Sequence, residues 1–102
     1  MSDPFRLDGK RAVVTGAGKG IGRGISLQLA KAGADLVISS RTQEDLDSLA
    51  VEIEALGRQV TKVVVDVTNT AELEDLAAQA VAGGGIDVWV NNAGGLPAAT
   101  PR

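Results

Sequence analysis

The 102-residue chain is 44% hydrophobic and 23% charged, which predicts one soluble globular unit with a small core. Its formal net charge of −3 provides no broad basic surface, so we expect neither nucleic acid nor an anionic membrane as a partner. Cysteine and histidine are both absent, which excludes a disulfide frame and the usual zinc ligands. With no apolar stretch of membrane-spanning length and no secretory signal at the start, the default expectation is a cytoplasmic protein.

The first predicted strand, Arg11 to Thr15, ends at a cluster of glycines that opens a helix. Its continuous apolar residues are typical of a strand covered on both faces. Glycines leave the backbone open to a pyrophosphate, and the first turn of a helix offers free N–H groups and the positive end of the helix dipole. The cluster is therefore a candidate phosphate site. In the alternative interpretation, the glycines only form a tight turn and let the helix pack closely on the sheet.

The glycine spacing, Gly-x-x-x-Gly-x-Gly, differs from the Gly-x-Gly-x-x-Gly dinucleotide fingerprint but keeps its mechanics. It is also not a Walker A loop, because Gly20 follows Lys19 where a serine or threonine would hold magnesium. The candidate cofactor-binding residues of this loop are Gly16, Gly18, Lys19, Gly20, Ile21 and Gly22.

The helix after the glycines, residues 21–32, repeats isoleucine or leucine at four-residue intervals and ends at the C-cap glycine Gly33. The repeated residues are Ile21, Ile25 and Leu29. A second strand is predicted over residues 36–38. Thr42 can cap a second helix, which Gly57 stops and whose apolar face carries Leu46, Leu49, Ala50, Ile53 and Leu56.

The last part of the chain adds a strand over residues 60–65, a third helix and a strand over residues 86–90. Asn69, with Glu72 three positions later, resembles a capping box for the third helix. Residues of this helix that we expect to be buried are Leu73, Leu76, Ala77 and Ala80.

Alternating strands and helices predict an α/β fold with a doubly wound parallel sheet, in which only the first four strands are present, in the order 3-2-1-4. The first two helices then cover one face and the third covers the other alone. A ligand is expected at the carboxyl ends of the strands, where the winding reverses. Four segments meet at that edge, namely Gly16 to Gly22, Ser39 to Arg41, Asp66-Val67 and Asn91 to Gly94.

The end of the second strand indicates which dinucleotide the site prefers. An acidic residue there binds the ribose hydroxyl of NAD, whereas an arginine accommodates the 2′-phosphate of NADP. The position reads Ser39-Ser40-Arg41, and the acidic Asp35 lies at the wrong end of the strand. Lys19 is a second cation that can reach the same phosphate, so NADP(H) is favoured over NAD(H). Alternatively, Lys19 and Arg41 are two solvated surface cations.

The ends of the third and fourth strands also carry candidate site residues. Asp66 can accept a hydrogen bond from the amino group of adenine, with Val67 supplying a backbone contact, or it can serve a turn. The doubled asparagine of Asn91-Asn92 exceeds what a turn requires and therefore suggests a site.

Taken together, these residues resemble the amino-terminal half of the short-chain dehydrogenase/reductase family, which carries Thr-Gly-x-x-x-Gly-x-Gly, an aspartate after the third strand and Asn-Asn-Ala-Gly after the fourth. The match covers essentially the whole chain and implies a Rossmann-type fold. It implies that the glycine loop binds the pyrophosphate and that Asp66 and Val67 bind the adenine. Basic residues at the positions of Lys19 and Arg41 mark NADP-preferring members. Binding of the nicotinamide-side ribose is implied for Asn92, Ala93 and Gly94.

Family members transfer a hydride with a serine and a Tyr-x-x-x-Lys pair beyond the asparagine motif, but this chain contains no tyrosine. No catalytic residue is therefore named. We expect residues 1–102 to be the dinucleotide-binding portion of a single-domain oxidoreductase, with the catalytic carboxyl-terminal half absent. The resemblance implies a carbonyl or secondary alcohol substrate and a homo-oligomeric parent protein. The alternative is a non-catalytic nucleotide-binding or interaction module complete at Arg102, whereas a methyltransferase is disfavoured because no carboxylate ends the second strand.

Overall fold

The computed structural model describes residues 6–66 and 68–92. Its centre is a parallel sheet of four strands in the order β3-β2-β1-β4, as the sequence predicts. The strands are β1 (Arg11–Thr15), β2 (Asp35–Ser40), β3 (Val60–Val64) and β4 (Val88–Asn91). Because β1 pairs with both β2 and β4, the chain reverses its winding beside β1. A crevice at the carboxyl ends of β1 and β4 is the usual ligand position in such a sheet.

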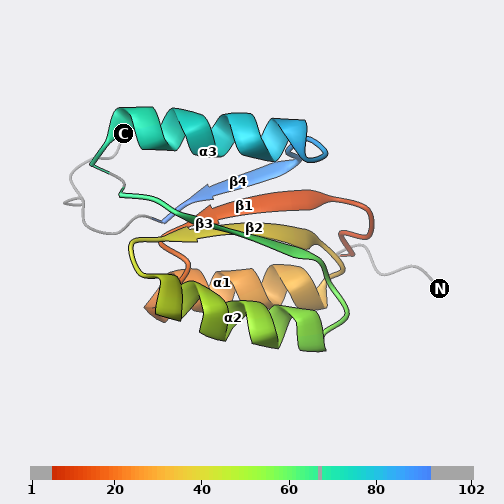
Figure 1. Ribbon diagram of the computed structural model, residues 1–102. Helices are drawn as coiled ribbons and strands as arrows, with labels where there is room; N and C mark the ends of the chain where they lie inside the picture. Colours follow the sequence, from red (N-terminus) through yellow and green to blue (C-terminus); the bar gives the residue numbers. More distant parts are fainter. Residues whose placement is uncertain (1–5, 67, 93–102) are drawn as a thin grey trace.

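Three helices cover the sheet unequally (Figure 1). The helices α1 (Gly20–Lys31) and α2 (Gln43–Ala55) lie side by side on one face, and α3 (Thr70–Ala82) lies on the other. This arrangement follows from right-handed crossovers, which turn to the opposite face when the direction of winding reverses. Within the described ranges, none of the helices is long and apolar enough to cross a membrane.

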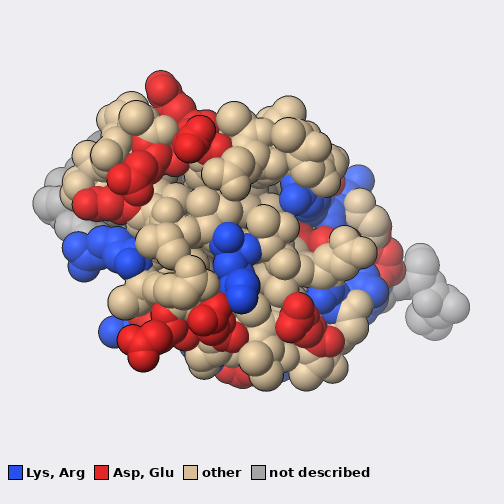
Figure 2. Space-filling view, in the orientation of Figure 1, with Lys and Arg blue, Asp and Glu red and all other residues tan. Residues whose placement is uncertain are grey.

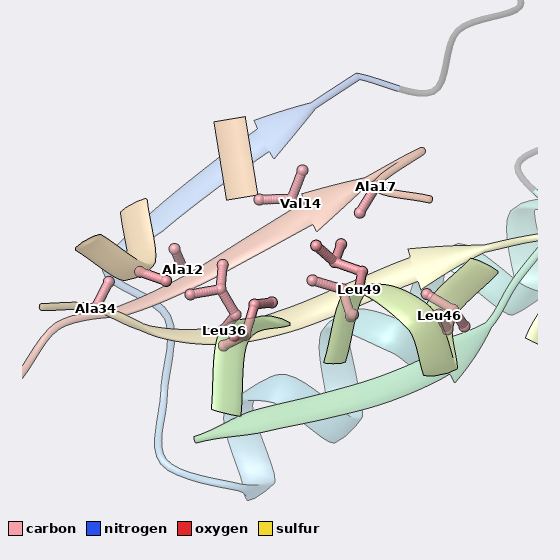
Figure 3. Packing of buried hydrophobic residues seen from close by; sticks show 10 residues of the cluster. Ala12, Val14, Ala17, Ala34, Leu36, Leu46 and Leu49 are labelled. Carbon is pink, nitrogen blue, oxygen red and sulfur yellow. The ribbon is translucent and has the colours of Figure 1, made fainter. Parts of the chain in front are cut away.

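The core has two layers because alternate side chains of each strand point to opposite faces of the sheet. Ala12 and Val14 belong to the larger cluster, which also contains Leu36 and Leu49 (Figure 3). The helices α1 and α2 cover this cluster. Val13 belongs to the smaller cluster, whose other buried members are Val37, Val65, Leu76 and Ala80. Each fully buried leucine or valine contributes about 1.5–3 kcal/mol through the hydrophobic effect.

The buried face of α1 is offset from the predicted stripe of isoleucine and leucine. Ile21 is 74% exposed, and Ile25 and Leu29 are only partly buried. The residues that α1 buries are instead Gly22, Ser26 and Ala30. Small side chains let the helix approach the sheet closely, so the larger residues lie along the edges of the contact.

The helix ends agree with the predicted caps except at α2. Asn69 Oδ1 accepts from Glu72 N at 3.2 Å, and Asn69 Nδ2 donates to Glu72 Oε2 at 3.1 Å, which gives α3 its capping interaction. Gly33 follows α1 with a φ of +106°, a conformation that favours glycine. Thr42 is the N-cap of α2, but its side chain accepts no cap hydrogen bond, and its hydroxyl donates to the Asp45 carboxylate.

Candidate functional site

Hydrogen bonds within or directly beside the four candidate segments connect them at the carboxyl edge of the sheet. Ala17 N, in the glycine loop, donates to Ser39 O at 2.9 Å. Val65 N, after β3, donates to Ser40 O at 2.9 Å. Asn92 N, after β4, donates to Thr15 Oγ1 at 2.9 Å. The structure therefore brings these segments into one connected edge. Val67, Ala93 and Gly94 of the candidate set lie outside the described residues.

Gly22 is where the glycine loop, α1 and the end of β4 meet. A Cβ at this position would lie 2.1 Å from Gly16 O and 2.6 Å from Asn92 Nδ2, so no other residue fits without a shift of the backbone. Asn92 Nδ2 itself lies 3.4 Å from Gly16 O and donates to it. The side chain of Asn92 is thus held against the loop, and the absence of a Cβ at Gly22 makes this approach possible.

Two other glycines of the loop have backbone conformations that favour glycine. The φ angles are +63° at Gly16 and +57° at Gly20. A Cβ at Gly20 would meet nothing within 4 Å, so that glycine is required by conformation and not by space. The tight turn and the close helix packing of the alternative interpretation are therefore both present, and both also leave the loop backbone free of side chains.

Thr15 fixes the two asparagines after β4. Its side chain is fully buried, and its Oγ1 donates to Asn91 Oδ1 at 3.1 Å while it accepts from Asn92 N. A buried hydroxyl that both donates and accepts is well satisfied. The buried threonine at the end of β1 thereby determines how the chain leaves β4.

The candidate 2′-phosphate residues lie beside the end of β2. Lys19 and Arg41 are both exposed, and Ser40 Oγ accepts from Thr42 N at 3.3 Å. Lys19 Nζ lies 3.7 Å from Asp45 Oδ2, an acid on the first turn of α2. Figure 2 shows basic side chains at the end of the molecule to which the strands of Figure 1 point, with acidic groups over α3 above them and over α2 below.

Asp66 forms the turn that the alternative interpretation expected. Its Oδ1 accepts from Thr68 N at 2.9 Å and from Thr68 Oγ1 at 2.7 Å. These hydrogen bonds, aided by the charge of Arg41, hold the pKa of the Asp66 carboxyl below its ordinary value against a smaller opposing effect of burial. Within the described ranges, no hydrogen bond engages Asp66 Oδ2. An ionised acceptor atom therefore remains at the edge of the sheet while the other oxygen holds the turn.

Arg23 is a structural residue of the site that the sequence analysis missed. Its Nη1 donates to Gly18 O at 3.3 Å, and its Nη2 donates to Ser48 Oγ at 2.9 Å and to Glu52 Oε2. The guanidinium thus ties the glycine loop to the middle of α2. No sequence signal marks this role, because the partners lie 25 and 29 residues away on another helix.

The described residues contain no cluster of acidic, histidine or cysteine side chains that could hold a metal ion. A shallow apolar groove runs elsewhere, along α1, and is lined by Leu7, Ile21, Gly24, Ile25, Gln28, Leu29 and Ala32. The candidate site is therefore an open edge made of glycine backbone, amide, carboxylate and basic groups. This composition suits a nucleotide with an anionic centre and a polar base.

The order of the strands and the placement of the helices define an α/β protein of the doubly wound, Rossmann-like type. Residues 10–101 match the family model described as short chain dehydrogenase. The chain therefore belongs to the short-chain dehydrogenase/reductase family, and the resemblance noted in the sequence is confirmed.

Relatives support this membership over most of the chain. An uncharacterized oxidoreductase of Mycobacterium tuberculosis is 49% identical over 94 residues, covering 91% of this chain and 36% of the relative. The 7alpha-hydroxysteroid dehydrogenase of Escherichia coli strain K12 is 44% identical over 95 residues, covering 92% of this chain and 37% of that enzyme. The chain thus spans little more than a third of the length of these relatives.

A solved structure is similar in backbone as well as in sequence. The L-sorbose reductase of Gluconobacter frateurii, crystallised with NADPH and L-sorbose, superposes with a TM-score of 0.84 at 35% identity. The match covers 89% of this chain and 35% of that protein. Oxidoreductases of this family use a nicotinamide cofactor, which agrees with the chemistry of the edge.

Proposed function

We propose that this chain is the NADP(H)-binding half of an oxidoreductase that transfers a hydride between NADPH and a carbonyl or secondary alcohol. The observation that carries the proposal is the pair of exposed cations, Lys19 and Arg41, beside a strand end that carries no acid. Arginine at this place accommodates a 2′-phosphate, and an acid would repel it. The NADPH in the crystal structure of the related L-sorbose reductase supports the same choice.

The described residues fit such a cofactor. Gly18 and Gly22 let the loop pack against Ser40, Asp45 and Gly16, whereas a Cβ at Gly20 would meet nothing within 4 Å, so the loop is open there. A pyrophosphate is the ligand that suits exposed N–H groups at the start of a helix. Asp66 Oδ2 is an acceptor for the amino group of adenine. Asn92, whose amide is anchored on Gly16 O, would orient the ribose on the nicotinamide side. When bound, the nicotinamide ring carries the hydride, and residues of this chain bind and orient it.

The proposed assignment keeps every candidate residue in one role. In this assignment the pyrophosphate is bound by Gly16, Gly18, Gly20, Ile21 and Gly22, and the 2′-phosphate by Lys19, Ser40 and Arg41. The adenine is bound by Asp66 and Val67, and the nicotinamide-side ribose by Asn92, Ala93 and Gly94. The names of the relatives, a hydroxysteroid dehydrogenase and an L-sorbose reductase, support an alcohol or carbonyl substrate. A cytoplasmic homo-oligomer that binds neither nucleic acid nor membrane remains our expectation for the parent protein.

The test is fluorescence titration of the full-length protein with NADPH and NADH. Charge-assisted hydrogen bonds contribute about 1.5–3 kcal/mol, and exposure reduces that, so we expect a preference for NADPH of about tenfold or more. The double variant K19M/R41M should lose this preference. Lys10→Met, which removes an exposed cation just before β1 at the opposite edge, should retain it. Equal affinities, or tighter binding of NADH, would contradict the proposal.

Turnover gives a second readout of the same proposal. The full-length protein should oxidise NADPH in the presence of ketones or reduce NADP⁺ in the presence of secondary alcohols. A full-length protein that binds NADPH but turns over no member of a broad panel of ketones and alcohols would favour the non-catalytic nucleotide-binding module instead.

A further inference from the structure

Asp45, on the first turn of α2, brings a carboxylate to the end of β2, where neither Ser40 nor Arg41 supplies one. A Cβ on Gly18 would lie 2.6 Å from Asp45 Cβ and 2.9 Å from Ser40 Oγ. Asp45 is therefore packed directly against the glycine loop at its approach to β2. Sequence reasoning missed it because it follows the strand end by five residues and belongs to the next helix.

A hydrogen bond from Thr42 holds the carboxylate of Asp45 in place, whereas the ammonium group of Lys19 beside it is largely exposed. Asp45 Oδ2 accepts from Thr42 Oγ1 at 2.8 Å and lies 3.7 Å from Lys19 Nζ. The Asp45 side chain is 26% exposed, against 82% for Lys19. Lys19 thus already has an anionic partner. A 2′-phosphate that recruits Lys19 must compete with this carboxylate and lie near its charge.

We propose that Asp45 is a specificity-determining residue that limits the preference for 2′-phosphorylated dinucleotides by competing for Lys19. The inference rests on the proposed NADP(H) site. A 2′-phosphate brings a second anion to the cluster, whereas the neutral 2′-hydroxyl of NADH does not. Loss of the Asp45 charge therefore strengthens NADPH binding and leaves NADH binding nearly unchanged, which is specificity set by a repulsive element.

The test measures the dissociation constants of NADPH and NADH for the full-length protein and for Asp45→Asn. This replacement preserves the shape of the side chain and an oxygen that can accept from Thr42. We expect NADPH to bind about fivefold more tightly and NADH to change by less than twofold. Glu44→Gln is the matched control, because Glu44 lies on the same turn but forms no side-chain hydrogen bond or ion pair within the part of the chain that the structure describes. Its effect should stay below twofold.

The Lys19→Met variant tests whether Asp45 acts by competing for Lys19. In Lys19→Met there is no cation to compete for, so adding Asp45→Asn should strengthen NADPH binding by less than it does when Lys19 is present. Asp45→Ser provides a second charge-removing variant if the asparagine variant is unstable, and thermal melting of each protein checks that the fold is kept.

The outcomes separate the two proposals. If the wild type prefers NADPH and Lys19→Met weakens that preference, but charge removal at Asp45 leaves the ratio of affinities unchanged or lowers it, the inference about Asp45 is wrong and the NADP(H) site stands. If the wild type has no preference and Lys19→Met changes neither affinity, both proposals are overturned.

Discussion

At Gly22, any side chain would meet backbone instead of a movable neighbour. Because a Cβ there would lie 2.1 Å from Gly16 O, we expect Gly22→Ala to lower the free energy of unfolding by about 1–3 kcal/mol and to weaken NADPH binding at least tenfold. Gly24→Ala is the matched control, because it lies one half-turn further along α1 and its Cβ would meet nothing within 4 Å. That variant should gain about 0.5–1 kcal/mol from helix propensity.

Chemical denaturation and NADPH titration of the full-length protein measure both effects. Normal binding by a folded Gly22→Ala variant would mean that close packing at this glycine is not needed for the cofactor. A loss of stability in Gly24→Ala as large as that in Gly22→Ala would show that the destabilisation comes from replacing a glycine in α1, and not from the contact between Gly22 and the loop.

The acidity of Asp66 is a second property at the level of the residue. The two hydrogen bonds from Thr68 hold the pKa of Asp66 below its ordinary value, so the folded state has the lower pKa of the two states. Its contribution to stability is present above the unfolded-state pKa, about 3.9, and is lost as the pH falls through the folded-state pKa.

Thr68→Val removes the hydroxyl donor and keeps the backbone donor. We therefore expect the pKa of Asp66 to rise toward its ordinary value in this variant, as followed by a carboxyl-carbon NMR titration. Thr70→Val, a nearby threonine that no described hydrogen bond ties to Asp66, serves as the control. An unchanged Asp66 pKa in Thr68→Val would show that the Thr68 hydroxyl is not the main cause of the lowered pKa.

Among the elements, Arg23 connects α1 and α2 and steadies the glycine loop between them. Arg23→Met keeps most of the aliphatic stem but removes the donors to Gly18 O, Ser48 and Glu52. The side chain is 25% exposed, so we expect a loss of about 1–2 kcal/mol in stability and a several-fold weaker affinity for NADPH.

Lys62→Met is the matched control for Arg23, because it breaks an exposed ion pair between β3 and Asp47 of α2 without touching the loop. It should cost at most about 1 kcal/mol and leave NADPH binding unchanged. Equal effects of the two variants on NADPH binding would contradict a specific role of Arg23 at the loop.

The elements themselves were largely predictable from the sequence. Hydrophobic periodicity, the glycine stops and the Asn69 cap are local signals, and the alternation of strands and helices restricts the order of the sheet. The buried face of α1 was harder to predict, because small residues such as Ser26 carry little hydrophobic signal. The contacts of Asp45 and Arg23 depend on how α2 packs against α1 and the loop. The spacing of residues within a single helix does not predict this packing.

For the whole molecule, the two faces of the sheet are covered unequally (Figure 1). Two helices cover one face, and α3 alone lies on the other, where Trp89 of β4 remains 38% exposed and Val81 of α3 remains 62% exposed. The relatives are nearly three times as long as the matched region. We propose that the remainder of the full-length protein covers this side of the sheet and supplies the groups that donate or accept the proton during hydride transfer.

We propose that the carboxyl edge of the sheet holds NADP(H), with its 2′-phosphate between Lys19 and Arg41. The most direct measurement is a crystal structure of the full-length protein with NADP⁺. We expect the 2′-phosphate within hydrogen-bonding distance of both cations, the pyrophosphate on the loop from Gly16 to Gly22, and the adenine amino group on Asp66. A 2′-phosphate that points into solvent away from both cations, or a dinucleotide bound at another edge, would contradict this assignment.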